Sequence, residues 1–168
     1  MFTVQSQLHN LQDSLLNSFA LATDSYRLCT FGDADDGLGA AVPNYFGEIS
    51  GQMRTFLERL AFPWLSYNDY SNTAPKRMPV LLIETQNGIK ERNNCNGYGS
   101  MEYCITQALG EPEKLTAYNT YQVKNYANYE LAGFSEEAKR QYRDEHWEDD
   151  LQHAYDAGRR MAEKIIGR

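Results

Sequence analysis

Two short stretches of this chain are almost continuously apolar, residues 38–42 and residues 78–84. Such runs are typical of strands that are buried on both faces of a parallel sheet. Residues 26–31 and 114–123 favour two further strands. Each of the two apolar runs ends in a turn sequence and is followed by a helical pattern, as in βαβ units. We therefore predict an α/β domain in which residues 38–42 and 78–84 are parallel, adjacent central strands.

Four segments carry apolar residues at helical spacing. They are residues 8–21, a helix that Ser50 caps and that reaches about Leu60, residues 98–109, and a long charged helix over residues 136–166. Acidic residues at the start of the last helix suit the partial positive charge of a helix N-terminus. No internal repeat divides the 168 residues, so we expect one domain, residues 1–168, that is long enough to bury a core.

The charge balance of the chain argues against two classes of partner. The formal net charge is −7, whereas nucleic acids and anionic membranes both require a basic face. No apolar run approaches the roughly 20 residues that span a bilayer. The first ten residues, MFTVQSQLHN, lack the basic residues and the apolar core of a signal peptide. The expectation is a cytoplasmic protein with no nucleic-acid or membrane partner.

Metal-binding patterns are weak in this sequence. Cys29, Cys95 and Cys104 are widely spaced and form no C-x-x-C pair, so we expect free thiols in a reducing compartment and no zinc or cluster site. His146 and His153 lie two helical turns apart among acidic residues, a pattern more typical of a solvated helix face than of a metal site. We predict no metal ligand.

The stretch VPNYFGEISGQMRTFLERL, residues 42–60, combines the end of a predicted strand, an aromatic loop and a capped helix. It resembles the P-x-Y-F-G-x-x-S-G-Q-M/L-K-x-F-x-D-R-L stretch of the NADPH-dependent FMN reductase family, with Arg54 in place of the usual lysine and Glu58 in place of the usual aspartate. The matching residues are Pro43, Tyr45, Phe46, Gly47, Ser50, Gly51, Gln52, Met53, Phe56, Arg59 and Leu60.

The resemblance implies a flavodoxin-like three-layer α/β/α sandwich with a parallel sheet. It extends more loosely from Asp33 to the C-terminal helix and does not cover the first thirty or so residues. The iron–sulfur flavoproteins are relatives of this family, but their compact cysteine motif is absent here.

The resemblance also implies where FMN would bind. In open α/β sheets, ligands bind outside the carboxyl ends of the strands. The flavin ring is expected between the loop after the first central strand and the turn after the second, although Tyr45 and Phe46 could instead be ordinary core residues. The expected cofactor-binding residues are Pro43, Asn44, Tyr45, Phe46, Gly47, Thr85, Gln86, Asn87 and Gly88.

The implied reaction is hydride transfer from NAD(P)H to flavin, followed by transfer of electrons to an acceptor. The flavin supplies the chemistry, so no side chain is named as catalytic. The chain would then be an NAD(P)H-dependent FMN oxidoreductase, a flavin reductase or a flavodoxin-like flavoprotein. The sequence does not distinguish NADH from NADPH.

The phosphate-binding loop that the family places before its first helix is not recognisable. The corresponding residues 3–10 contain no glycine or arginine, and Ser6 is the hydroxyl closest to the helix start. We expect this N-terminal strand and loop to be truncated or diverged, and FMN binding to be weak. The alternative is a flavodoxin-fold module with weak or no FMN binding that acts as an interaction or oligomer subunit.

Aromatic residues are frequent in the predicted loops, notably Tyr67, Tyr70, Tyr126 and Tyr129. Aromatic side chains are enriched at protein interfaces, and members of the resembled family commonly form oligomers. We predict a homo-oligomer. The competing interpretation is that these tyrosines cover the core of their own domain.

Overall fold

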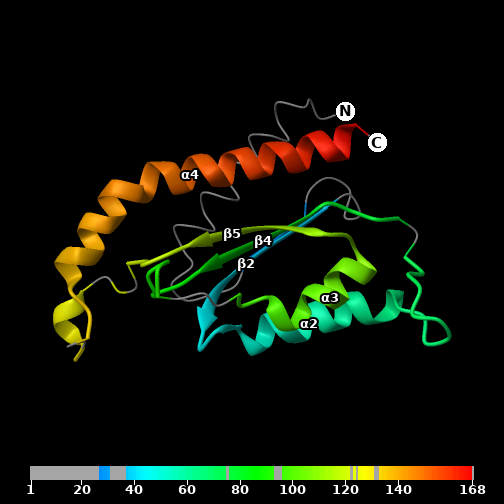
Figure 1. Ribbon diagram of the computed structural model, residues 1–168, viewed down its shortest axis with the longest axis horizontal. Helices are drawn as coiled ribbons and strands as arrows, with labels where there is room; N and C mark the ends of the chain where they lie inside the picture. Colours follow the sequence, from blue (N-terminus) through cyan, green and yellow to red (C-terminus); the bar gives the residue numbers. More distant parts are fainter. Residues whose placement is uncertain are drawn as a thin grey trace.

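The computed structural model describes most of the chain after its first strand (Figure 1). The described residues are 27–30, 37–74, 76–92, 96–121, 123, 125–130 and 133–167. The helix predicted over residues 8–21 and the altered phosphate loop lie outside them.

One sheet of mixed direction forms the centre of the fold. Three parallel strands, β2 (Leu38–Tyr45), β4 (Val80–Thr85) and β5 (Pro112–Ala117), lie side by side in that order. Strand β1 (Arg27–Thr30) pairs antiparallel with the other side of β2, and the short β3 (Glu48–Ile49) forms a hairpin with the end of β2. The predicted parallel pairing of the two apolar runs is therefore confirmed.

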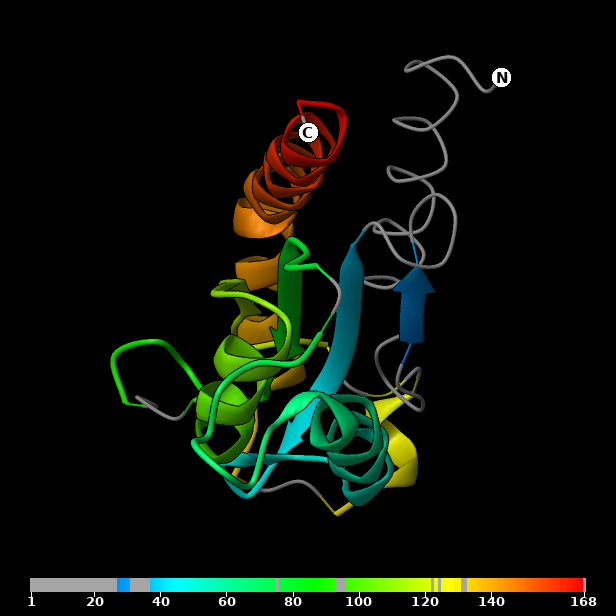
Figure 2. The same cartoon turned by 90° about the vertical axis from the view of Figure 1, so that its right-hand side faces the viewer.

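Helices cover both faces of this sheet and complete a three-layer α/β/α sandwich (Figures 1 and 2). Helices α2 (Gly51–Ala61) and α3 (Gly99–Ala108) pack on one face, and the long α4 (Glu136–Ile166) crosses the other. Two single 3₁₀ turns, η1 (Phe62–Trp64) and η2 (Tyr126–Asn128), lie in the connections. This is the flavodoxin-like architecture that was expected.

The two apolar runs form central strands because both of their faces are buried. Side chains that alternate along a strand point to opposite faces of the sheet. One set packs against α2 and α3, and the other packs against Ala157 and Met161 of α4. The first set is Leu38, Ala40, Val42, Val80 and Leu82, and the second is Ala41, Leu81 and Ile83.

The helix boundaries follow the capping residues. Ser50 Oγ accepts a hydrogen bond from the Met53 amide at 3.3 Å and caps α2, as predicted. Ser135 Oγ does the same for the Ala138 amide at 3.2 Å, at the start of α4. Helix α4 begins and ends at the predicted residues.

Two strand boundaries were predicted incorrectly. Strand β2 does not stop at Pro43 but continues to Tyr45, because Pro43 pairs in parallel with Thr85 and the next two residues pair with β3. The described residues of β1 reach only Ala41, and proline is tolerated where a strand has a free edge. Phe46 and Gly47 are then the two turn residues of a tight hairpin, with φ of 56° and 87°. Strand β5 starts before residue 114 and ends at Ala117, so residues 118–121 are free to form a loop.

No helix among the described residues combines the length and the apolar character needed to cross a membrane.

Candidate functional site

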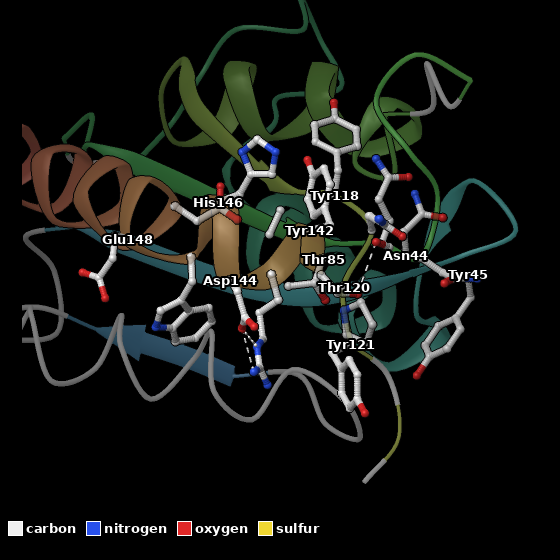
Figure 3. A pocket seen from close by; sticks show the side chains of 18 residues that line it. Asn44, Tyr45, Thr85, Tyr118, Thr120, Tyr121, Tyr142, Asp144, His146 and Glu148 are labelled. Atoms are coloured by element: carbon white, nitrogen blue, oxygen red, sulfur yellow. Dashed lines mark hydrogen bonds and ion pairs between the residues drawn. The ribbon is translucent and has the colours of Figure 1, made fainter. Parts of the chain in front are cut away.

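A cavity of about 710 Å³ lies at the carboxyl ends of β2, β4 and β5 (Figure 3). The ends of β2 and β4 contribute residues 43–45 and 85–87, and the segment after β5 contributes residues 117–121. Residues between Tyr142 and Asp150 of α4 form the remaining side. This is the edge at which open α/β sheets bind their ligands.

The structure brings together six of the nine residues expected to bind the cofactor. Pro43, Asn44 and Tyr45 approach from β2, and Thr85, Gln86 and Asn87 approach from β4. Phe46, Gly47 and Gly88 are outside the residues that line the cavity. Phe46 is fully exposed because it occupies the tip of the β2–β3 hairpin.

Sequence analysis missed the half of the cavity that β5 and α4 supply. Residues 118–121 were assigned to a strand, and the acidic residues around His146 and His153 were interpreted as a solvated helix face. The tyrosines that directly follow β5 were the signal that could have identified this side of the cavity, because β5 is parallel to β2 and β4 and its carboxyl end lies at the same edge of the sheet. The missed aromatic residues are Tyr118, Tyr121, Tyr142 and Trp147.

A buried carboxylate fixes the β2 side of the cavity. Glu84 is only 3% exposed. Its two oxygens accept hydrogen bonds from Asn44 Nδ2 and from the Gly97 amide, the latter at 2.9 Å. Asn44 Oδ1 in turn accepts from the Gly47 amide at 2.8 Å. The hairpin, the end of β4 and the segment before α3 are therefore held as one unit by the Glu84 and Asn44 side chains and the two backbone amides that they accept from.

The phenol of Tyr98 lies behind this unit. Its hydroxyl is within hydrogen-bonding distance of the Ala40 and Ile83 carbonyl oxygens, at 3.1 and 3.2 Å. Burial, and to a smaller extent the negative charge of Glu84, raise the pKa of Tyr98 far above its ordinary value. Tyr98 therefore acts as a permanent hydrogen-bond donor that joins α3 to the sheet.

A buried amine fixes the opposite side of the cavity. Lys139, in the first turns of α4, is only 3% exposed. Its Nζ donates to Asn119 Oδ1 at 3.0 Å, to the Thr120 carbonyl at 3.2 Å and to the Asn87 carbonyl at 3.4 Å. It also lies 5.5 Å from the centre of the Phe134 ring. Lys139 thus ties α4 to the loops that follow β4 and β5.

Burial lowers the pKa of Lys139 to about 8, so this residue makes stability depend on pH. The unfolded chain, with an ordinary lysine pKa near 10.4, binds more protons than the folded chain between these two values. Stability therefore rises with pH across this window. We expect the free energy of unfolding of the wild type, relative to Lys139→Met, to increase between about pH 8 and pH 10 in urea titrations. A difference that stays constant with pH would contradict this expectation.

Charged residues are concentrated on the α4 side of the cavity. Arg143 pairs with Asp144 at 2.8 Å and lies 5.5 Å from the centre of the Tyr121 ring, so its charge is engaged. Glu148 and Asp150 add two carboxylates to the lining, and burial raises the pKa of Asp150. This side of the cavity is therefore acidic and unsuited to a phosphate group.

The side-chain oxygen of Asn87 is a notable polar atom of the cavity lining. Asn87 Oδ1 is buried and accepts no hydrogen bond from any described residue. A buried acceptor without a donor costs roughly 1–3 kcal/mol, so native structures seldom keep one unless a ligand or water supplies the donor. Asn87 therefore suits a ligand with an N–H or O–H donor.

Among the residues that the structure describes, no three histidine, cysteine or acidic side chains gather where they could hold a metal ion.

Comparison of the chain with family models, with curated proteins and with solved structures finds no match to any of them.

Proposed function

We propose that the cavity binds the isoalloxazine ring of FMN and that the chain is an NAD(P)H-dependent FMN oxidoreductase. The observation that carries this proposal is the convergence of two segments on one cavity. The β2 end and the β4 end were expected to hold the ring from sequence resemblance alone, and residues 43–45 and 85–87 line the same 710 Å³ space.

The residues of the cavity fit a flat ring with polar edges. A volume of this size falls within the roughly 300–1,000 Å³ range of small-molecule sites. Tyr45 is half exposed at the cavity edge and can cover one face of a ring. The unpartnered Oδ1 of Asn87 suits a ring N–H donor. Thr85 and Gln86 place further polar groups beside it.

When bound, the flavin would accept a hydride from NAD(P)H and deliver electrons to an acceptor. The chain's own contribution would be to bind, to orient and to exclude water. Tyr45 and Tyr118 would limit the position of the ring, while Asn87 would select its orientation. Helix α4 would close the side away from β2.

The phosphate of FMN has no evident partner in this cavity. Glu148 and Asp150 would repel it, and Arg143, the arginine of the lining, is paired with Asp144. Losing two or three charge-assisted hydrogen bonds, each worth about 1.5–3 kcal/mol, weakens binding by orders of magnitude. We therefore propose weak FMN binding, carried mainly by the ring.

A second candidate function follows from the same acidic lining. The chain could be a flavodoxin-fold module that binds FMN weakly or not at all and serves as an interaction or oligomer subunit. The homo-oligomer itself stays a prediction, as do NAD(P)H as co-substrate and the absence of nucleic-acid and membrane partners.

A fluorescence titration with FMN tests the proposal. We expect micromolar or weaker affinity for the wild type, and up to about tenfold weaker binding for Tyr45→Ala, because ring stacking is worth about 0.5–1.5 kcal/mol. Tyr103→Ala is the matched control, since Tyr103 is exposed on α3 and does not line the cavity. A Gly/Ser/Thr-rich loop introduced ahead of Leu8 should tighten binding.

Two outcomes would contradict the proposal in different ways. Nanomolar affinity in the unmodified chain would show that the phosphate is held after all. No detectable affinity, with or without the introduced loop, would favour the interaction module.

A further inference from the structure

The ammonium group of Lys139 is a buried positive charge that no described carboxylate neutralises. All of its hydrogen-bond partners are oxygens of neutral groups, one side-chain amide and two backbone carbonyls. Neutral oxygens solvate the ammonium group but leave its net charge in place.

The ammonium group of Lys139 contacts residues that line the cavity. Asn87, Asn119 and Thr120, whose oxygens receive the hydrogen bonds from Lys139, all line the cavity. A ligand that touches these residues therefore lies one residue away from the ammonium group. Coulomb interactions over such distances are much stronger at low effective dielectric than in bulk water.

The other charged side chains near the cavity are either paired with an opposite charge or lie on a different part of the lining from Lys139. Arg143 is paired with Asp144, and Glu136, close to Lys139 in sequence, is paired with Arg140 and bonded to Tyr121. Glu148 and Asp150 are more than two helical turns further along α4. The cavity thus has a positive end at the β4 and β5 loops and an acidic end on α4.

We propose that Lys139 makes the loop end of the cavity selective for rings that carry or gain a negative charge. For the flavin, this inference rests on the proposed function. Hydride transfer from NAD(P)H adds two electrons and one proton to the ring and leaves NAD(P)⁺, so the bound ring gains one negative charge. Lys139 stabilises that charge and raises the reduction potential of the bound ring.

The first experiment uses small rings and needs no flavin. At neutral pH, 4-nitrophenol is partly ionised and its phenolate absorbs at a longer wavelength than the phenol, whereas 4-nitroanisole has the same ring without the charge. We expect the wild type to bind the phenolate roughly tenfold more tightly than the anisole, from absorbance titrations. Lys139→Met should abolish this preference. Lys139→Arg, which keeps the charge, should retain it.

Lys114→Met is the control, because Lys114 lies exposed on β5 and pairs with Glu102 away from the cavity. Far-UV circular dichroism confirms that each variant is folded. The inference is overturned if the wild type shows no preference for the phenolate, if neither ring binds, or if Lys139→Met and Lys114→Met behave alike.

The second experiment measures the midpoint potential of bound FMN by reductive titration against a reference dye. In Lys139→Met, we expect the ratio of reduced to oxidised affinity to fall about tenfold, which for a two-electron couple corresponds to about 30 mV. An unchanged potential with FMN bound would overturn the role of Lys139 and leave the proposed function standing. If the phenolate preference depends on Lys139 but the chain does not bind FMN, the role of Lys139 stands and the proposed function is overturned.

Discussion

Replacing Gly110 with alanine is expected to lower the free energy of unfolding by about 3 kcal/mol, at the upper end of the cost of overpacking. A Cβ at this position would lie 2.5 Å from the carbonyl oxygen of Met78, far inside van der Waals contact. The oxygen cannot swing away as a side chain would, because it belongs to backbone that leads into β4. The neighbouring amide of Met78 also donates to the Leu109 carbonyl at 2.9 Å.

Gly51→Ala provides the control for this expectation. A Cβ at Gly51 meets no atom within 4 Å, and the residue begins α2, so alanine should be neutral or slightly stabilising there. Urea unfolding, followed by circular dichroism, compares the two variants. Equal midpoints for Gly110→Ala and the wild type would show that the β4 entry can shift at little cost.

The central sheet could be predicted because its strands are buried on both faces. A strand with two buried faces needs an uninterrupted apolar run, and β2 and β4 carry the two such runs of the described chain. Helix α4 was predictable to the residue because Ser135 caps its start and a charged helical pattern runs without interruption to Ile166.

The hairpin after β2 could not be predicted by the same local rules. Proline and asparagine normally mark the end of a strand, yet here Asn44 pairs with Ile49 across the hairpin. Pro43 lies opposite Thr85 in the parallel ladder with β4. Tertiary pairing overrides the turn preference of these residues, and a residue's partner in another strand is not encoded in its own neighbourhood.

The α4 side of the candidate site was missed for a related reason. Its charged residues have the composition of a solvent-exposed helix, and only the packing of α4 across the strand ends makes them part of a cavity. Lys139 is the extreme case, because a lysine in a charged helical segment is normally exposed. Its burial depends on oxygens from residues 87, 119 and 120, which are far from it in sequence.

The hydrogen-bond network around Glu84 supports the second prediction. Glu84→Gln is expected to lower the free energy of unfolding by about 2 kcal/mol. The carboxylate accepts from two donors, Asn44 Nδ2 and the Gly97 amide, whereas a glutamine has one acceptor oxygen for them. Rotating the Asn44 amide cannot resolve the conflict, because its Oδ1 already accepts from the Gly47 amide. Either the Asn44 NH₂ group or the Gly97 amide would therefore face the glutamine NH₂ group and lack an acceptor.

A second substitution should restore the network and thereby identify the cause. In the double variant with Asn44→Asp, the new carboxylate can accept from both the Gly47 amide and the glutamine NH₂, while the glutamine oxygen accepts from the Gly97 amide. Every donor again has an acceptor, and the total charge equals that of the wild type. We expect the double variant to regain most of the lost stability. Asn44→Asp alone should destabilise, because it places a second carboxylate against Glu84. Urea unfolding of the four proteins gives the coupling energy directly. If the two substitutions simply add, the donor conflict is not the source of the Glu84→Gln defect.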